Sequence, residues 1–100
     1  MPVIAHIVIE GVTPADYDAV RAACGWLDRQ PEGGLAHLTW WEGDTCRIID
    51  AWENEAAFEQ FAETRLGPAM AQAGVTSEPD VTFHAAHEVY LPRALTLTVT

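Results

Sequence analysis

The chain has 100 residues, enough for one small domain, and its fifteen Asp and Glu residues outnumber its five Lys and Arg residues, leaving a formal net charge of −10. Nucleic acid and anionic membrane surfaces are therefore not expected as partners, because binding their phosphates needs clustered cations. No apolar run approaches the length of about 20 residues that a membrane-spanning helix needs, and the start Met-Pro-Val-Ile lacks the basic region of a signal peptide. We expect a cytoplasmic protein.

Apolar residues make up 49% of the chain and include four Trp. So many apolar side chains in a small domain indicate an apolar cavity, a buried subunit interface, or both. Cys24 and Cys46 show neither metal-binding nor redox spacing, so we expect two buried free thiols.

Residues 3–10 are predicted to form the first strand, and they are almost uniformly apolar with His6 in the middle. Continuous apolarity favours a central strand that is covered on both faces. A helix is predicted over residues 14–27, with Thr13 as its N-cap. Its inward stripe comprises Tyr17, Val20, Ala23 and Cys24, and Trp26 is expected to fold back onto the core.

Two strands are predicted over residues 34–41 and 45–52, on either side of a tight Glu-Gly-Asp turn. A two-residue loop that pairs Trp41 with Asp44 would place His37 on the same sheet face as Ile48, Asp50 and Trp52, because side chains alternate along a strand. A three-residue loop would exchange the faces, and the sequence leaves this choice open.

A second helix is predicted over residues 54–73, with Asn54 as its cap and a kink or split at Gly67-Pro68. Its buried stripe comprises Ala57, Phe58, Phe61, Ala62, Leu66, Ala69, Met70 and Ala73. The last strand is predicted over residues 80–91. We expect the domain to span residues 1–92 and residues 93–100 to form either an extra strand or a flexible tail.

The predicted order is β-α-β-β-α-β, the ferredoxin-like α+β arrangement with an antiparallel sheet and helices on one face. The other sheet face has no helices over it and is expected to contact another molecule.

The chain resembles the dimeric α+β barrel superfamily, close to small antibiotic biosynthesis monooxygenase-like proteins. The likeness covers residues 2 to about 91 and rests on the element order, on the stretches 34–37 and 47–58, and on Phe61 and Leu66-Gly67-Pro68. The resemblance implies a homodimer in which two bare faces close a barrel. Relatives include cofactor-free oxygenases of polycyclic phenols, polyketide cyclases, isomerases of small ring acids and haem-degrading enzymes. Phe58 and Phe61 stand where the best-known monooxygenase pattern commonly has a His.

The four histidines are the main candidates for chemistry, because a neutral imidazole in an apolar cavity serves as a general base near pH 7. We expect His37 to be the base or hydrogen-bonder and Asp50 either to orient it or to accept a bond from Trp52. The alternative is a structural His–Asp contact that pins the hairpin. His84 and Tyr90 are predicted as secondary catalytic groups, whereas Tyr17 and Arg47 are weaker candidates.

An aromatic floor would suit a flat substrate, because stacking and apolar burial both favour polycyclic rings. The predicted substrate-binding residues are Trp41, Trp52, His6, Phe58 and Phe61; core and interface filling is the alternative role for each Trp. We expect neither a metal nor a cofactor, since no His-x-His, His-Glu-x-x-His or Gly-x-Gly-x-x-Gly motif occurs. If haem binds, a His would be its iron ligand.

The expected function is that of a cofactor-independent monooxygenase-like protein that acts on a hydrophobic aromatic or polyketide-type molecule. One alternative is a polyketide cyclase or isomerase with the same base, since all three reactions begin with proton abstraction. The other is a non-catalytic ligand-binding or accessory protein. Each of these functions is expected in a homodimer with a dry chamber lined by imidazole and indole rings.

Overall fold

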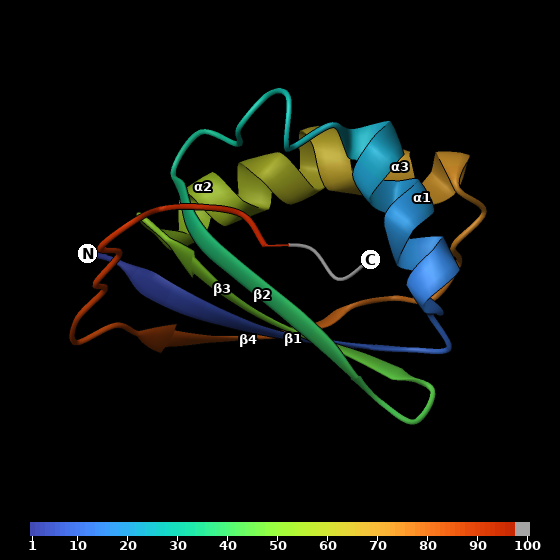
Figure 1. Cartoon of the computed structure of the whole chain (residues 1–100), viewed down its shortest axis with the longest axis horizontal. Coiled ribbons are helices and arrows are strands. Elements are labelled where there is room, and N and C mark those ends of the chain that lie inside the picture. The colour runs from blue at the N-terminus through green and yellow to red at the C-terminus, as the bar shows by residue number, and fades with distance from the viewer. Residues whose placement is uncertain (98–100) are drawn as a thin grey trace.

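The computed structural model describes residues 1–97. Its elements in chain order are β1 (Val3–Glu10), α1 (Pro14–Cys24), β2 (Gly34–Glu42), β3 (Thr45–Trp52), α2 (Glu55–Phe61), the π-helical segment η1 (Ala62–Leu66), α3 (Gly67–Gln72) and β4 (Asp80–Ala85). The strands form one antiparallel sheet in the order β2-β3-β1-β4, with the helices on one face (Figure 1). The predicted ferredoxin-like α+β fold is therefore confirmed. No helix within residues 1–97 is long and apolar enough to cross a membrane.

Strand β1 lies between β3 and β4, so its central position is confirmed. Its helix-facing residues Ala5, Ile7 and Ile9 are at most 7% exposed and belong to the core. Its other face, with Ile4, His6 and Val8, is only half-buried, and the helices lie on the opposite side of the sheet (Figure 1). Complete burial of β1 would thus require a second layer.

The β2–β3 hairpin turns through the two residues Gly43 and Asp44, and Gly43 has a φ of +60° as such tight turns require. Trp41 pairs with Cys46 rather than with Asp44, so the predicted pairing was wrong by two residues. A shift of two preserves the alternation of side chains, and the predicted faces hold. His37 lies directly opposite Asp50.

Helix α1 begins as predicted, with Thr13 and Asp16 forming a reciprocal capping box. It ends at Cys24 rather than at residue 27, because Gly25 adopts a left-handed conformation with a φ of +67°. Trp26 therefore lies in a turn beyond the helix and not on it.

The second predicted helix is divided by η1, where the Gly67 N–H donates to the Ala62 carbonyl five residues back. Pro68 offers no N–H to the Thr64 carbonyl, which removes one α-helical bond at this point. The apolar stripe also repeats every four residues, so it drifts by about 40° per turn on a regular helix of 3.6 residues per turn. One wider π turn offsets much of that drift and keeps Phe61 and Met70 on the core face.

Strand β4 ends at Ala85 rather than at residue 91, because its partner β1 begins at Val3, the residue paired with Ala85. The chain then leaves the sheet after one further bond from the Ala86 N–H to the Pro2 carbonyl. Residues 86–97 contain no strand, and residues 98–100 of the predicted extra strand or tail lie outside the described residues.

Candidate functional site

A continuous chain of hydrogen bonds joins four side chains on the helix-covered face of the sheet. The Tyr17 hydroxyl lies 2.6 Å from His37 Nε2, and His37 Nδ1 lies 2.7 Å from Asp50 Oδ1. The Trp52 indole N–H donates to Asp50 Oδ2 over 3.1 Å. Asp50 thus both orients His37 and accepts from Trp52, two roles that the sequence offered as alternatives.

Chemistry fixes the direction of these bonds. The indole N–H of Trp52 can only donate, and the carboxylate of Asp50 accepts from it and from the Nδ1–H of His37. In the neutral imidazole, His37 Nε2 then carries a lone pair and accepts from the Tyr17 hydroxyl. Burial raises the pKa of Tyr17, with smaller contributions from neighbouring charges, so this phenol remains protonated and donates at neutral pH.

Aromatic rings surround the imidazole. The Trp26 ring centroid lies 5.3 Å from that of His37, and the Tyr17 ring stacks on His37 at 6.0 Å. Trp41 meets Tyr17 edge-on at 5.6 Å and donates its indole N–H to the Val12 carbonyl over 2.7 Å. The side chain of His37 is 33% exposed, so part of the imidazole is accessible to a small molecule.

Four of the predicted site residues meet here: His37, Asp50, Trp41 and Trp52. Tyr17 is a direct partner of His37, although the sequence ranked it as a weaker candidate, and Trp26 was assigned only to the core. The available signal for Tyr17 was its place on the inward stripe of α1. That stripe does not show which strand residue lies opposite.

Phe58 and Phe61 lie beneath the site rather than at its surface. They contact Trp52 with centroid distances of 5.6 and 5.4 Å and are 6% and 9% exposed. Trp52 itself is only 4% exposed. These three rings support Asp50 from the core side, and a substrate would reach them only if the core opened.

Within one protomer His6 and His84 lie on the sheet face opposite His37, so the predicted grouping of these histidines with His37 is not found there, and the role of Tyr90 stays a prediction. His6 pairs with Thr82 and His84 with Ile4, on the face that carries no helices. Tyr90 follows the end of β4 and is 78% exposed. The physical reason is the two-residue period of a strand, which sends neighbouring residues to opposite faces.

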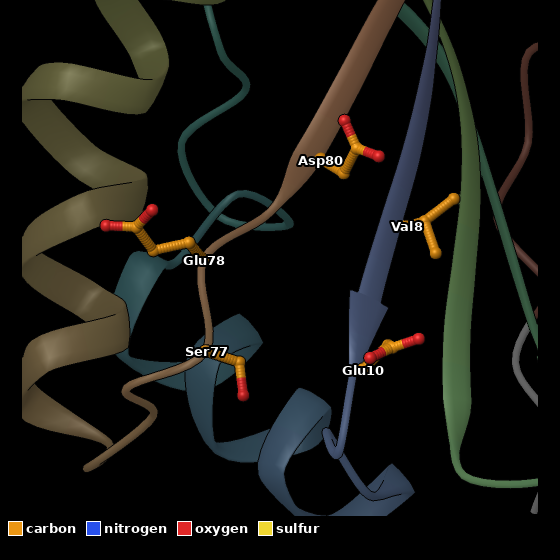
Figure 2. Close-up of a pocket in the computed structure, with 5 residues that line it drawn as sticks. All are labelled: Val8, Glu10, Ser77, Glu78 and Asp80. Carbon is orange, nitrogen blue, oxygen red and sulfur yellow. The ribbon is translucent and has the colours of Figure 1, made fainter.

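Two of the surface hollows within residues 1–97 have linings that do not include His37. One, of about 460 Å³, lies beside β1 and the approach to β4 and is lined by Val8, Glu10, Ser77, Glu78 and Asp80 (Figure 2). The other, of about 160 Å³, lies between α1 and the second helical stretch and is lined by Ala23, Cys24, Arg29, Thr64, Arg65, Pro68, Ala69 and Gln72. The chamber expected between sheet and helices is not among them, because core side chains fill that space.

Cys24 and Cys46 are buried free thiols as predicted, and burial raises the pKa of each. In the part of the chain that the structure describes, no three His, Cys, Asp or Glu side chains gather to hold a metal ion. His37 does not fit the role of a haem ligand, because both of its ring nitrogens already have partners.

No protein-family model matches the chain, and no curated protein matches it in sequence. Solved structures do match it in fold. A variant of SnoaB, a cofactor-independent oxygenase from Streptomyces nogalater, is 21% identical with a TM-score of 0.63, over 92% of this chain and 98% of that one. A protein of unknown function from Nitrosomonas europaea is 19% identical with a TM-score of 0.66, over 93% and 97%.

A proposed antibiotic biosynthesis monooxygenase from Deinococcus radiodurans is 18% identical with a TM-score of 0.59, over 91% of this chain and 98% of that one. These matches cover both chains almost end to end. At identities this low they show that the chains share a fold. This chain therefore has the ferredoxin-like protomer fold of the antibiotic biosynthesis monooxygenase-like structures, in agreement with the resemblance found in its sequence.

Proposed function

We propose that this chain is a cofactor-independent monooxygenase that oxidises a hydrophobic aromatic or polyketide-type molecule and works as a homodimer. The observation that carries this proposal is the hydrogen-bonded chain from Tyr17 through His37 to Asp50, set among aromatic rings. It supplies a base for a phenolic or enolic proton beside surfaces on which flat rings stack. The likeness in fold to SnoaB, a cofactor-independent oxygenase, supports the same reaction class.

Proton removal follows from the direction of the hydrogen bonds. A phenolic substrate donates its hydroxyl proton to the Tyr17 oxygen, while the Tyr17 proton passes to His37 Nε2. Asp50 stabilises the imidazolium that forms, as the carboxylate does in a Ser-His-Asp triad. The substrate is left as an electron-rich anion, and Tyr17 is again neutral.

The anion then reacts with oxygen without an added reductant. One electron passes to O₂, and the two radicals combine to form a carbon–oxygen bond at the ring carbon that is CH₂ in the keto form of the substrate and CH in the anion. The resulting hydroperoxide loses water to give a ketone, so that CH₂ and O₂ become C=O and H₂O. His37 returns its proton to the departing oxygen, and the protein holds the anion and excludes water.

The bare sheet face is the proposed dimer interface. Leu38 is 60% exposed and Trp40 is 40% exposed on this face, next to the half-buried Ile4, Val8 and Ile49. Apolar patches of this kind mark interaction surfaces. Two copies that apposed these faces would cover β1 on both sides, as its continuous apolarity predicts.

Oxygen uptake with an anthrone, in the presence of chelator and without flavin, tests the reaction. We expect substrate-dependent uptake, with kcat/KM lowered about 10²- to 10⁴-fold in His37→Ala, the range for loss of a general base. His87→Ala is the matched control, because His87 is an exposed histidine beyond the end of β4, and it should retain wild-type kcat/KM.

Two results would contradict the proposal and support a different function. Ring closure or isomerisation without oxygen uptake would identify a cyclase or isomerase that uses the same base. Saturable ligand binding without turnover, unchanged in His37→Ala, would identify a binding or accessory protein.

A further inference from the structure

Trp26 reaches His37 from a short turn beyond the end of α1. The turn follows Gly25, and the backbone N–H groups of Asp28 and Arg29 both donate to the Gly25 carbonyl, over 3.2 and 2.9 Å. The neighbouring side chain of Leu27 is 56% exposed. Local hydrogen bonds shape this turn, and Trp26 packs on the core and meets Tyr17 edge-on at a centroid distance of 5.8 Å. A contact from outside the turn would fix its backbone as well.

Arg65 makes that contact. Its Nη2 donates to the Cys24 carbonyl over 2.9 Å and to the Arg29 carbonyl over 2.8 Å. These two carbonyls stand on either side of Trp26, one at the end of α1 and one at the end of the turn. A guanidinium nitrogen carries two hydrogens in a rigid plane, so a single group can close both ends of the turn. Its charge also suits the negative end of the α1 dipole.

Arg65 is itself held in place from the other side of the site. Its guanidinium carbon lies 5.3 Å from the centroid of the Phe61 ring, a cation–π distance. Phe61 packs on Trp52, whose indole N–H donates to Asp50. Arg65 therefore links the turn that carries Trp26 to the rings that support Asp50. It lies in η1, and π-helical turns are frequent at functional sites.

We infer that Arg65 is a positioning residue that holds Trp26 against His37 and so shields the imidazole from water. The role of Arg65 in turnover rests on the proposed function, whereas its effect on the exposure of His37 does not. A test that reads exposure directly separates the two.

Arg65→Met keeps an apolar stem over Phe61 and removes every donor. The probe is diethylpyrocarbonate, which modifies accessible imidazoles, with the rate at each histidine followed by peptide mass spectrometry. We expect the His37 rate to rise up to about threefold, because its side chain is 33% exposed in the wild type. His84 in the same chain is the internal reference and should not change.

Arg29→Gln is the matched control, because it removes a charge from the same turn but keeps the backbone carbonyl that Arg65 bonds. It should react like the wild type. Trp26→Ala should raise the His37 rate as Arg65→Met does, and the double variant should show no further increase, because both changes remove the same cover.

A His37 rate unchanged in Arg65→Met, or additive effects in the double variant, would overturn the inference. If Arg65→Met unfolds, all histidines react faster together, and Arg65→Gln then decides. The Gln side chain ends two bonds short of the Arg Nη2 and cannot reach both carbonyls, so the His37 rate should still rise against His84 in the folded protein, and a wild-type ratio would count against the inference.

Oxygen uptake adds a separate readout. If the wild type turns over an anthrone, Arg65→Met should lower kcat/KM while Arg29→Gln leaves it unchanged. Absence of turnover in the wild type, together with the expected His37 rates, would overturn the proposed function and leave the positioning role of Arg65 intact.

Discussion

Among the side chains of the site, we expect the loss of Asp50 to lower the stability of the fold most, because two donors bond to it inside the core. Asp50→Ala removes the acceptor of the His37 Nδ1–H and of the Trp52 indole N–H. Asp50 is 6% exposed and Trp52 is 4% exposed, so water does not readily replace the lost carboxylate at the indole. His37, at 33% exposure, regains part of its bond from water.

The magnitude follows from these exposures. A hydrogen bond to a charged group contributes about 1.5 to 3 kcal/mol, and we take the upper figure for Trp52 and the lower for His37. The sum of about 4.5 kcal/mol is reduced because Asp50→Ala also removes the cost of burying a charge. We expect a net loss of about 3 kcal/mol, which lowers Tm by about 12 to 24 °C in a domain of this size.

Urea unfolding followed by far-UV circular dichroism measures this loss. Glu59→Ala is the matched control, because it removes an exposed carboxylate from a chain of net charge −10 without breaking a buried bond, and its stability should lie close to the wild type. A loss below about 1 kcal/mol for Asp50→Ala would refute the reasoning, because it would mean that neither donor depends on the carboxylate.

Three further outcomes are expected. The pKa of Tyr17 is raised in the folded protein, so the unfolded chain releases this proton first and the stability of the fold decreases as pH rises above about 10. In Tyr17→Phe this decrease should be smaller when the free energy of unfolding is measured by chemical denaturation from pH 9 to 12. Gly33→Ala should lower the free energy of unfolding by about 2 to 3 kcal/mol, because φ is +83° and a new Cβ would lie 2.7 Å from Ala57 Cβ. Gly43→Ala, where φ is +60° but the space around a new Cβ is open, should lower it by about 1 kcal/mol. Equal losses of stability in thermal unfolding would contradict this. Leu38→Glu should convert a dimer to a monomer in sedimentation velocity, and a wild type that sediments as a monomer would contradict the proposed interface.

Local patterns in the sequence determined the element order and the capping of α1, and they grouped His37 with Asp50 on one face on the condition that the hairpin loop has two residues. These features depend on neighbours within a few residues, where the periods of helix and strand are fixed by backbone geometry. For that reason the His37–Asp50 pair was predicted even though the hairpin pairing was wrong by two residues.

Only the tertiary structure decided what surrounds that pair. Tyr17 and Trp26 reach His37 because α1 and the turn after it pack over β2, a contact between elements whose relative placement no local period specifies. The length of β4 likewise depended on where its partner β1 begins. His84 is a histidine like His37, but its surroundings differ, because the alternation of side chains along β4 places it on the opposite face of the sheet.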